Sequence, residues 1–469
     1  MTLTLPRALR VAIIGSGPSA FYAAEHLQKA AAWDIQIDMF ERLPTPYGLV
    51  RGGVAPDHPK IKTVAKVYEK IALKPGFRFF GNVEFGSGIT HADLSARYHA
   101  VIYAVGAQTD RRLGIPGEDL PGSHAATEFV GWYNAHPDYR HLTFDLTQTA
   151  AAVIGNGNVA MDVARILASS RAELAATDIA DHALDALAVS RVTDIYILGR
   201  RGIAQAAFTN PELKELGVLT DADVIVQPGA DVLDPLSADL LARTADRDAI
   251  KNVTTLASYA AQSPQGKPKR LHLHFLVSPV RLIGTDRVEA IELAQNELIA
   301  AEDGSLRPRT TDRAITIPIG LVFRSIGYHG VALSGVPFDA RGGVIPNIEG
   351  RVIGADGIPH PGEYVVGWIK RGPSGIIGTN KPDSQATVER LLADADAGML
   401  PMPTSVDDAA DLLARGGCDV VTFADWQALD ALELARGAAV GRPRVKYASI
   451  DVMMAAIADA RLHAPRTDS

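Results

Sequence analysis

The sequence of 469 residues contains a single cysteine, Cys418. One thiol cannot form an internal disulfide, a CxxC redox pair, a cysteine-ligated iron–sulfur cluster or a four-cysteine zinc site. Any redox chemistry must therefore use electrons carried on a bound cofactor. Such sparse cysteine usage is typical of a reducing compartment, so we expect a cytoplasmic protein.

Long apolar runs and an excess of positive charge are also missing. No stretch approaches the roughly 20 apolar residues of a membrane span, and the opening residues MTLTLPRALR lack the apolar core of a signal peptide. The net charge is −8, which disfavours nucleic-acid binding through overall positive charge. With 47% hydrophobic and 21% charged residues, the chain has the composition of a packed protein of two or three domains.

The sequence contains, twice, a predicted strand followed by a glycine loop and a helix. The small residues of the two loops are Gly15, Gly17 and Ala20, and Gly155, Gly157 and Ala160. In such a loop the first glycine permits a tight turn, the second lets the backbone approach a pyrophosphate, and the third lets helix and strand pack closely. Two loops about 140 residues apart predict an α/β fold with two Rossmann-like, dinucleotide-binding domains.

Short β-branched runs predict further strands. These lie at 35–40, 100–105, 194–198, 271–277, 288–293, 321–326 and 364–366, and an extra helix is predicted over 178–187. Turn-rich passages at 106–117 and 325–330 suit crossings between domains. We therefore expect residues 1–109 and 326–469, with a C-terminal extension, to form a split domain around an inserted domain of 110–325. The polar stretch 229–269 has no assignable pattern.

The first loop has an acidic partner. Glu41 directly follows the second predicted strand, 21 residues after Ala20, where a carboxylate can accept from both ribose hydroxyls of an adenosine. The helix that follows the loop offers free N–H groups to the phosphates. A glycine turn that only packs is the alternative, but strand, helix and acid together favour nucleotide binding.

The second loop has a basic partner instead. The strand 194–198 leads into Gly199, Arg200 and Arg201, and two guanidiniums at this place suit the 2′-phosphate of NADP. A solvated basic turn is the alternative, and the interval from Ala160 is longer than usual. One acid-tipped and one arginine-tipped site predict FAD in the first and NADPH in the second, with hydride transfer to the flavin and release of single electrons.

These motifs and their order resemble ferredoxin–NADP reductases of the adrenodoxin reductase type. The matching runs are GSGP at 15–18, ERLPTPYGLVR at 41–51, GVAPDHP at 53–59, GNVE at 81–84, GNGNVAMD at 155–162, GRRG at 199–202, QAAFT at 205–209 and GWIKRGPSGIIG at 367–378. One departure is the pair Ser19 and Ala20, where the family more often has Ala-Gly. The resemblance fades beyond about residue 400, where we expect Cys418 to act as a buried apolar residue.

The resemblance implies FAD bound by the split domain and NADP by the inserted one. The FAD contacts that it implies, together with the loop glycines, are Gly15, Gly17, Ser19, Glu41, Leu49, Val83, Trp368, Gly375, Ile376 and Ile377. The NADP contacts are Gly155, Asn156, Gly157, Asn158, Val159, Arg200, Arg201, Glu212 and Gly375. A core position is the alternative for Trp368, and a helix is expected from about residue 380.

The resemblance places His58 and Glu215 where flavin and nicotinamide meet. There they would position the reactants and supply a proton, because hydride transfer itself needs no acid or base. A turn histidine and a solvated helix acid are the alternatives. No metal site is predicted.

Lys62, Lys66 and Lys70 recur every four residues, as one basic stripe on the helix expected after His58. Most such stripes are only solvated, but ferredoxins are typically acidic, so this stripe is a candidate docking face. The predicted function is an FAD-dependent NADPH:ferredoxin oxidoreductase, with hydride passing to flavin N5 and single electrons to an iron–sulfur ferredoxin. The alternatives are an NADPH diaphorase or quinone reductase, an electron-input subunit of a larger enzyme, and a non-catalytic NADP(H)-binding regulator.

Overall fold

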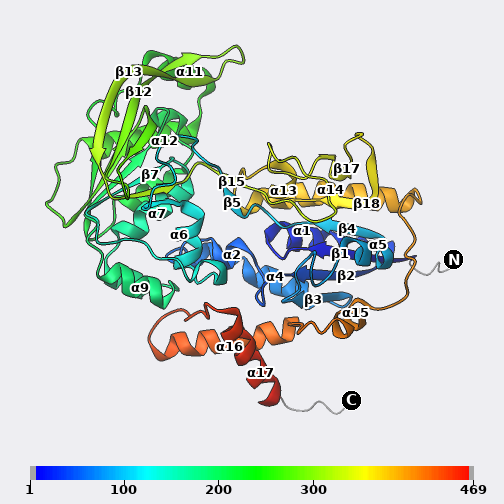
Figure 1. Cartoon of the computed structure of the whole chain (residues 1–469). Coiled ribbons are helices and arrows are strands. Elements are labelled where there is room, and N and C mark those ends of the chain that lie inside the picture. The colour runs from blue at the N-terminus through cyan, green and yellow to red at the C-terminus, as the bar shows by residue number, and fades with distance from the viewer. Residues whose placement is uncertain (1–6, 464–469) are drawn as a thin grey trace. The chain divides into compact units, whose positions relative to one another are not determined.

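The computed structural model describes residues 7–463 and divides them into two compact units (Figure 1). The first unit contains the chain up to Val54, then His58–Thr109, and all described residues from Tyr328 onward. The second contains Asp110–Gly327 together with the tripeptide Ala55–Asp57. Each unit has its own mainly parallel sheet and its own helices, which confirms the predicted α/β class with one domain inserted into another.

The first unit is built on a seven-stranded sheet in the order β16-β17-β18-β4-β1-β2-β3. Its strands are β1 (Arg7–Ile14), β2 (Trp33–Glu41), β3 (Phe77–Gly81), β4 (Ala100–Tyr103), β16 (Asn347–Ile348), β17 (Arg351–Ile353) and β18 (Pro359–Val365). The run from β18 to β3 is parallel, and β16 and β17 extend it antiparallel. In β1, Val11 and Ile13 face one buried side while Ala12 and Ile14 face the other, so the second half of this central strand is apolar on both faces.

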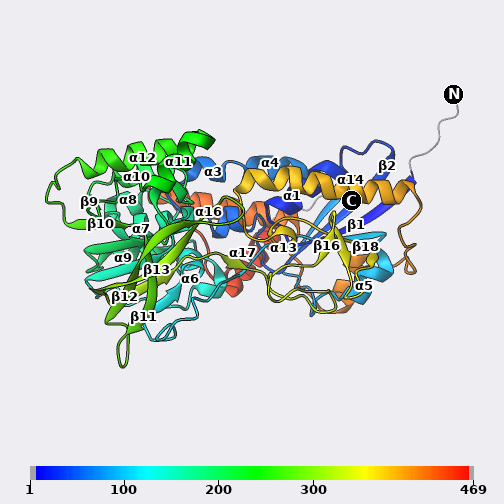
Figure 2. The same cartoon turned by 90° about the horizontal axis from the view of Figure 1, so that it is seen from above.

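Helices cover both faces of this sheet. They are α1 (Pro18–Leu27), α2 (Leu49–Gly52), α3 (Pro59–Lys62), α4 (Ala65–Ala72), α5 (His91–Arg97), α13 (Trp368–Arg371), α14 (Asn380–Asp396), α15 (Ala409–Arg415), α16 (Phe423–Ala439) and α17 (Ile450–His463). Figure 2 shows α14 lying along α1, and the two pack closely. As expected, a helix begins at Asn380.

The second unit has a six-stranded parallel sheet in the order β6-β14-β7-β8-β10-β9. Its strands are β6 (Ser123–Ala125), β7 (Ala150–Ile154), β8 (Asp194–Leu198), β9 (Ala222–Val226), β10 (Lys269–His274) and β14 (Leu321–Arg324). An antiparallel sheet joins β11 (Val277–Ile283), β12 (Ala290–Ala300) and β13 (Leu306–Pro318). The helices are α6 (Ala126–Tyr133), α7 (Asn158–Ala168), α8 (Arg171–Ala175), α9 (Asp181–Ala188), α10 (Asn210–Leu216), α11 (Pro235–Thr244) and α12 (Arg247–Ala260).

The two crossings between the units run as paired short strands, β5 (Thr109–Asp110) and β15 (Tyr328–His329). At the first unit's end the Thr109 hydroxyl donates to the His329 carbonyl, and at the second unit's end the Arg111 amide donates to the Gly327 carbonyl. Across residues 7–463, every helix is too short or too polar to span a bilayer.

Two local predictions were wrong, and one stretch without a predicted pattern is helical. The single strand predicted over 271–277 is two, because Leu276 takes a φ of +55° and turns the chain between β10 and β11. The unassigned stretch 229–269 holds α11 and α12. The single helix expected after His58 is also two, so Lys62 ends α3 while Lys66 and Lys70 lie on α4.

Candidate functional site

The first glycine of each predicted loop turns the chain where no other residue fits. Gly15 has a φ of +97°, and a Cβ there would lie 2.7 Å from the Ala104 carbonyl oxygen. Gly155 has a φ of +128°, and its Cβ would lie 2.1 Å from the Ser325 carbonyl oxygen. A left-handed backbone against a neighbouring strand end leaves room for glycine alone. Both loops therefore have the tight turn that a dinucleotide-binding loop needs.

The second glycine of each loop faces open space instead. A Cβ on Gly17 or Gly157 would meet no atom within 4 Å. These glycines are the N-caps of α1 and α7, and among the described residues no side chain caps either helix. An uncapped helix N-terminus beneath open space fits a pyrophosphate, which would take the free N–H groups as hydrogen-bond donors.

Glu41 lies where β2 ends, directly beside the first loop. Its carboxylate accepts hydrogen bonds from the Ser16 hydroxyl at 2.7 Å, from the Ser16 amide at 3.1 Å and from the Leu43 amide at 3.1 Å. The Val83 amide donates to the Glu41 carbonyl at 2.9 Å, which ties the predicted Val83 position to the same strand end. The structure thus brings loop, acid and Val83 together at the carboxyl edge of the sheet.

The segment before Leu49 also reaches the first loop. Leu49 begins α2 and is half-buried, and a Cβ on the preceding Gly48 would lie 3.0 Å from the Gly17 Cα. Ser19, in the first turn of α1, is buried. Its small side chain keeps the turn intact despite the departure from the family pattern.

The segment 367–378 closes on the same region. A Cβ on Gly367 would lie 2.5 Å from the Ser19 hydroxyl oxygen, and the Gly367 amide donates to Asp383 at 2.7 Å. Trp368 is half-buried and its indole N–H donates to the Ser374 carbonyl at 3.2 Å, so it is not a core residue. Ile376 is 61% exposed. The neighbouring Gly375 is exposed and Ile377 is half-buried, so this stretch offers accessible backbone and apolar surface to a ligand.

In the second unit, β8 delivers Arg200 and Arg201 to the edge that carries the second loop. Arg200 is exposed and Arg201 half-buried, and neither guanidinium has an ion-pair partner within residues 7–463. Burial, and then the charge of Arg200, lower the pKa of Arg201 below its ordinary value. Two adjacent cations that lack an acid fit a phosphate group.

Asn156 adds a donor to this second loop. Its side-chain nitrogen is buried and, within the described part of the chain, has no hydrogen-bond partner. Such an orphaned donor costs free energy unless a ligand accepts from it. Asn158, by contrast, is already used, because its side-chain oxygen accepts from the Thr209 amide at 2.9 Å. Val159 lies in the first turn of α7.

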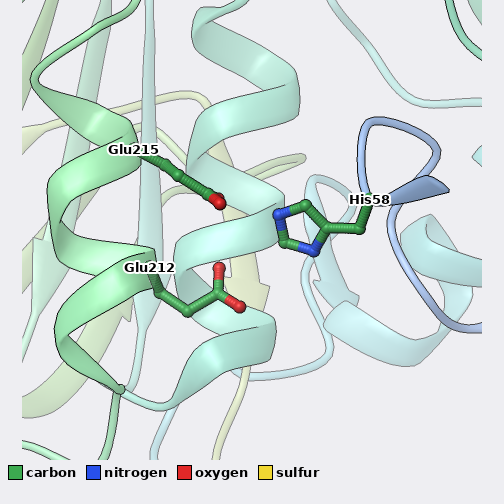
Figure 3. A group of neighbouring side chains, drawn as sticks. All are labelled: His58, Glu212 and Glu215. Atoms are coloured by element: carbon green, nitrogen blue, oxygen red, sulfur yellow. The ribbon is translucent and has the colours of Figure 1, made fainter. Parts of the chain in front are cut away.

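Glu212 and Glu215 project from α10, with carboxylate oxygens within 4.8 Å of each other (Figure 3). Glu212 accepts a hydrogen bond from an Arg165 nitrogen at 3.2 Å, and Glu215 forms an ion pair with the same nitrogen at 3.2 Å. Glu212 is buried against this guanidinium, whereas the Glu215 side chain is 39% exposed. Because both carboxylates already pair with the Arg165 guanidinium, they are poor ligands for a metal ion.

Arg165 is surrounded by carboxylates and was missed by sequence reasoning. It lies on α7, is 2% exposed, and also pairs with Asp162 at 2.7 Å and with Asp57 at 2.5 and 3.0 Å. Burial alone would lower its pKa, but the surrounding acids raise it well above its ordinary value. The available signal was the pair of charged residues, Asp162 and Arg165, within the otherwise apolar stretch 160–168.

His58 comes directly after Asp57 in the chain and occupies the N-cap position of α3. Figure 3 draws its side chain together with the two glutamates. Its neighbour Asp57 belongs to the second unit, where its carboxylate pairs with Arg165 at 2.5 and 3.0 Å.

Comparison with known proteins agrees with this arrangement. Residues 9–203 match the family described as pyridine nucleotide-disulphide oxidoreductase. The sole cysteine, Cys418, lies outside that match. It is half-buried, whereas a buried residue was expected from the sequence. The chain is 50% identical over 454 residues to NADPH-ferredoxin reductase FprA of Mycobacterium tuberculosis (strain H37Rv), covering 95% of this chain and 98% of that protein.

A more distant relative and a solved structure agree. Over 465 residues the chain is 37% identical to the mitochondrial NADPH:adrenodoxin oxidoreductase of Arabidopsis thaliana, covering 97% of this chain and 96% of that protein. The structure of Mycobacterium tuberculosis FprA in complex with NADPH superposes with a TM-score of 0.90 at 48% identity, over 96% of this chain and 100% of that one. The predicted resemblance is thereby confirmed: the chain belongs to the family of NADPH–ferredoxin reductases that includes FprA and adrenodoxin reductase.

Proposed function

We propose that this protein is an FAD-dependent NADPH:ferredoxin oxidoreductase that binds FAD in the first unit and NADP(H) in the second. The observation that carries the proposal is the pair of open glycine loops with unlike partners, Glu41 for one and Arg200 with Arg201 for the other. When bound, NADPH supplies a hydride to FAD, which passes electrons one at a time to an iron–sulfur ferredoxin. Relatives named NADPH-ferredoxin reductase support this reading.

The chain's own part is to hold and orient two dinucleotides. The helix N-termini at Gly17 and Gly157 offer amides to the two pyrophosphates, and Asn156 adds its unpartnered side-chain donor. Glu41 fixes the adenosine of FAD, and the two arginines select the 2′-phosphate of NADP. The segment from Trp368 to Ile377 covers the flavin and excludes water, supported by the approach of Gly367 to Ser19.

We assign His58 and Glu215 to positioning and proton supply. The support is that Glu215 and Asp57, the residue before His58, both pair with Arg165. His58→Gln should lower the rate of ferredoxin reduction several-fold and alter its pH profile while the flavin stays bound. Glu212→Gln serves as the comparison variant. Because Glu212 is buried, this substitution should lower stability and affect NADPH binding. An unchanged pH profile in His58→Gln would remove the histidine from this role.

The ferredoxin docking face is proposed at Lys66 and Lys70 of α4, with Lys62 at the end of α3. Lys66 and Lys70 are exposed and one helical turn apart, which gives an acidic partner two adjacent cations. The double variant Lys66→Gln, Lys70→Gln should raise KM for ferredoxin and flatten its salt dependence. Lys29→Gln, an exposed lysine of the same unit, is the control. Parallel salt curves for ferredoxin and for a small artificial acceptor would contradict the docking face.

From the sparse cysteine usage we propose a cytoplasmic location for the protein.

The decisive experiment is a paired acceptor assay on the purified protein. It should be yellow, release FAD on denaturation, bleach with NADPH under anaerobic conditions, and reduce ferredoxin faster than a quinone. Faster quinone reduction would favour a diaphorase, and a flavin that NADPH cannot bleach would favour a regulator. Colourless protein that takes up no FAD would refute the proposal.

A further inference from the structure

Helix α16, the last but one along the described chain, carries a carboxylate that is fully buried. Glu433 has 0% of its surface exposed, and it is fully committed to partners in the first unit. It accepts from the two terminal nitrogens of Arg51 at 2.8 and 2.6 Å, from Arg444 at 3.1 Å and from the Tyr447 amide at 2.8 Å. Burial would raise the pKa of Glu433, but Arg51 first and then Arg444 hold it below its ordinary value. The group is therefore a charged anchor inside the fold.

Arg51 lies two residues beyond Leu49 and is held from three directions by the C-terminal region. Besides its pair with Glu433, its guanidinium lies over the ring of Trp426, 5.1 Å from the ring centroid. Its carbonyl accepts from the Lys446 ammonium at 3.3 Å. Trp426 in turn meets the Tyr47 ring edge-on at 5.8 Å. The contacts of α16 and the following loop thus converge on residues 47–51.

Residues 47 and 48 form a strained turn against the first glycine loop. Tyr47 has a φ of +85°, a conformation that is unfavourable for a side chain of this size and persists only where the surroundings impose it. Its amide donates to the Ser16 carbonyl at 3.0 Å. The adjacent Gly48 lies so close to the loop that a Cβ would be 3.0 Å from the Gly17 Cα. Any relaxation of this turn would move the backbone next to the open space above Gly17.

We infer that Glu433 is a positioning residue for the flavin site: through Arg51 it holds the Tyr47–Gly48 turn against the Gly15–Gly17 loop and thereby sets how firmly FAD is retained. The inference rests on the proposed function, which makes FAD the ligand of that loop. A buried ion pair is weak support for stability, because desolvation offsets much of the attraction. What the pair provides is one fixed geometry, since its bidentate arrangement allows a single orientation of Arg51.

The test compares flavin release in matched variants of the full-length holoenzyme. Glu433→Gln and Arg51→Met break the anchor. Arg461→Met breaks a comparable bidentate pair, with Asp425 at 2.9 Å, that joins α17 to α16 and touches nothing in residues 47–51. The rate of FAD loss is followed by the rise in flavin fluorescence after dilution, and the Tm of each holoenzyme is measured in parallel.

We expect both anchor variants to release FAD about tenfold faster or more, while Arg461→Met stays within about twofold of the parent even if its Tm falls as far. If Glu433→Gln does not fold, Arg51→Met decides, because Glu433 then keeps Arg444 and the Tyr447 amide. Release at the parental rate in the anchor variants, or equal acceleration in Arg461→Met, would overturn the inference. A parent that binds no FAD would instead refute the proposed function.

Discussion

The hydroxyl of Ser16 donates to the carboxylate of Glu41 at 2.7 Å, linking the first glycine loop to the end of the neighbouring strand. The carboxylate therefore supports the loop and, by our proposal, the adenosine ribose as well. Glu41→Ala should weaken FAD binding by about tenfold to a hundredfold, since hydrogen bonds to a charged group contribute about 1.5–3 kcal/mol each. Titration of deflavinated protein with FAD checks this, and an unchanged affinity would remove Glu41 from the site.

The second glycines of the two loops allow a reciprocal test. The Cβ of a valine at Gly17 or Gly157 would meet no protein atom. At this atom, neither substitution should disturb the fold of the cofactor-free protein. Gly17→Val should yield protein that has lost its flavin. Gly157→Val should keep the flavin but raise KM for NADPH at least tenfold. Flavin content by absorbance and steady-state kinetics distinguish the two, and loss of flavin in Gly157→Val would contradict the assignment of cofactors to units.

The unpaired arginines after β8 should determine coenzyme preference. Replacing Arg200 or Arg201 by alanine removes a charged hydrogen-bond donor to the 2′-phosphate, which is worth about tenfold or more in KM for NADPH. KM for NADH should change by less than about threefold, because NADH lacks that phosphate. Equal losses with both coenzymes would show that the arginines support the fold and do not read the phosphate.

Acid should destabilise the second unit through His124. Burial next to Phe144 and Phe323 and, secondarily, the charge of Arg324 lower the pKa of His124 to about 4. The unfolded chain, with a histidine pKa near 6.5, therefore binds more protons, so the free energy of unfolding falls as pH drops from about 6.5 to 4. His124→Phe should reduce this fall. Urea unfolding at pH 7.5, 5.5 and 4.5 measures it, with the exposed His141→Phe as control; equal pH dependence in parent and His124→Phe would contradict the prediction.

The parallel sheets were predictable because each strand and its loop carry a local signal. The strand 194–198 has the predicted bounds, and α14 begins at the expected residue. Helices α11 and α12 were not visible, since both are largely exposed and polar although Asp234 and Asp246 cap them. The turn at Leu276 was hidden because no glycine or proline marks it within 271–277 and because leucine rarely takes a positive φ.

The candidate site also contains residues that a local sequence signal predicts and residues that it does not. Glycines, Glu41 and the two arginines have positions that a short motif dictates, and the structure places them at the strand ends where the motif requires them. The pair of Arg165 with Asp57 spans 108 residues, and that of Arg51 with Glu433 spans 382. No periodicity or spacing indicates such long-range partners, because they depend on how the whole unit folds.

The tripeptide Ala55–Asp57 means that the inserted unit cannot be cut out cleanly. A fragment of 110–327 expressed alone would leave Arg165 with three of its four acids and an open place where Asp57 belongs. Grafting this unit onto another reductase therefore requires that these three upstream residues are grafted as well. During synthesis they leave the ribosome well before the rest of the unit to which they belong.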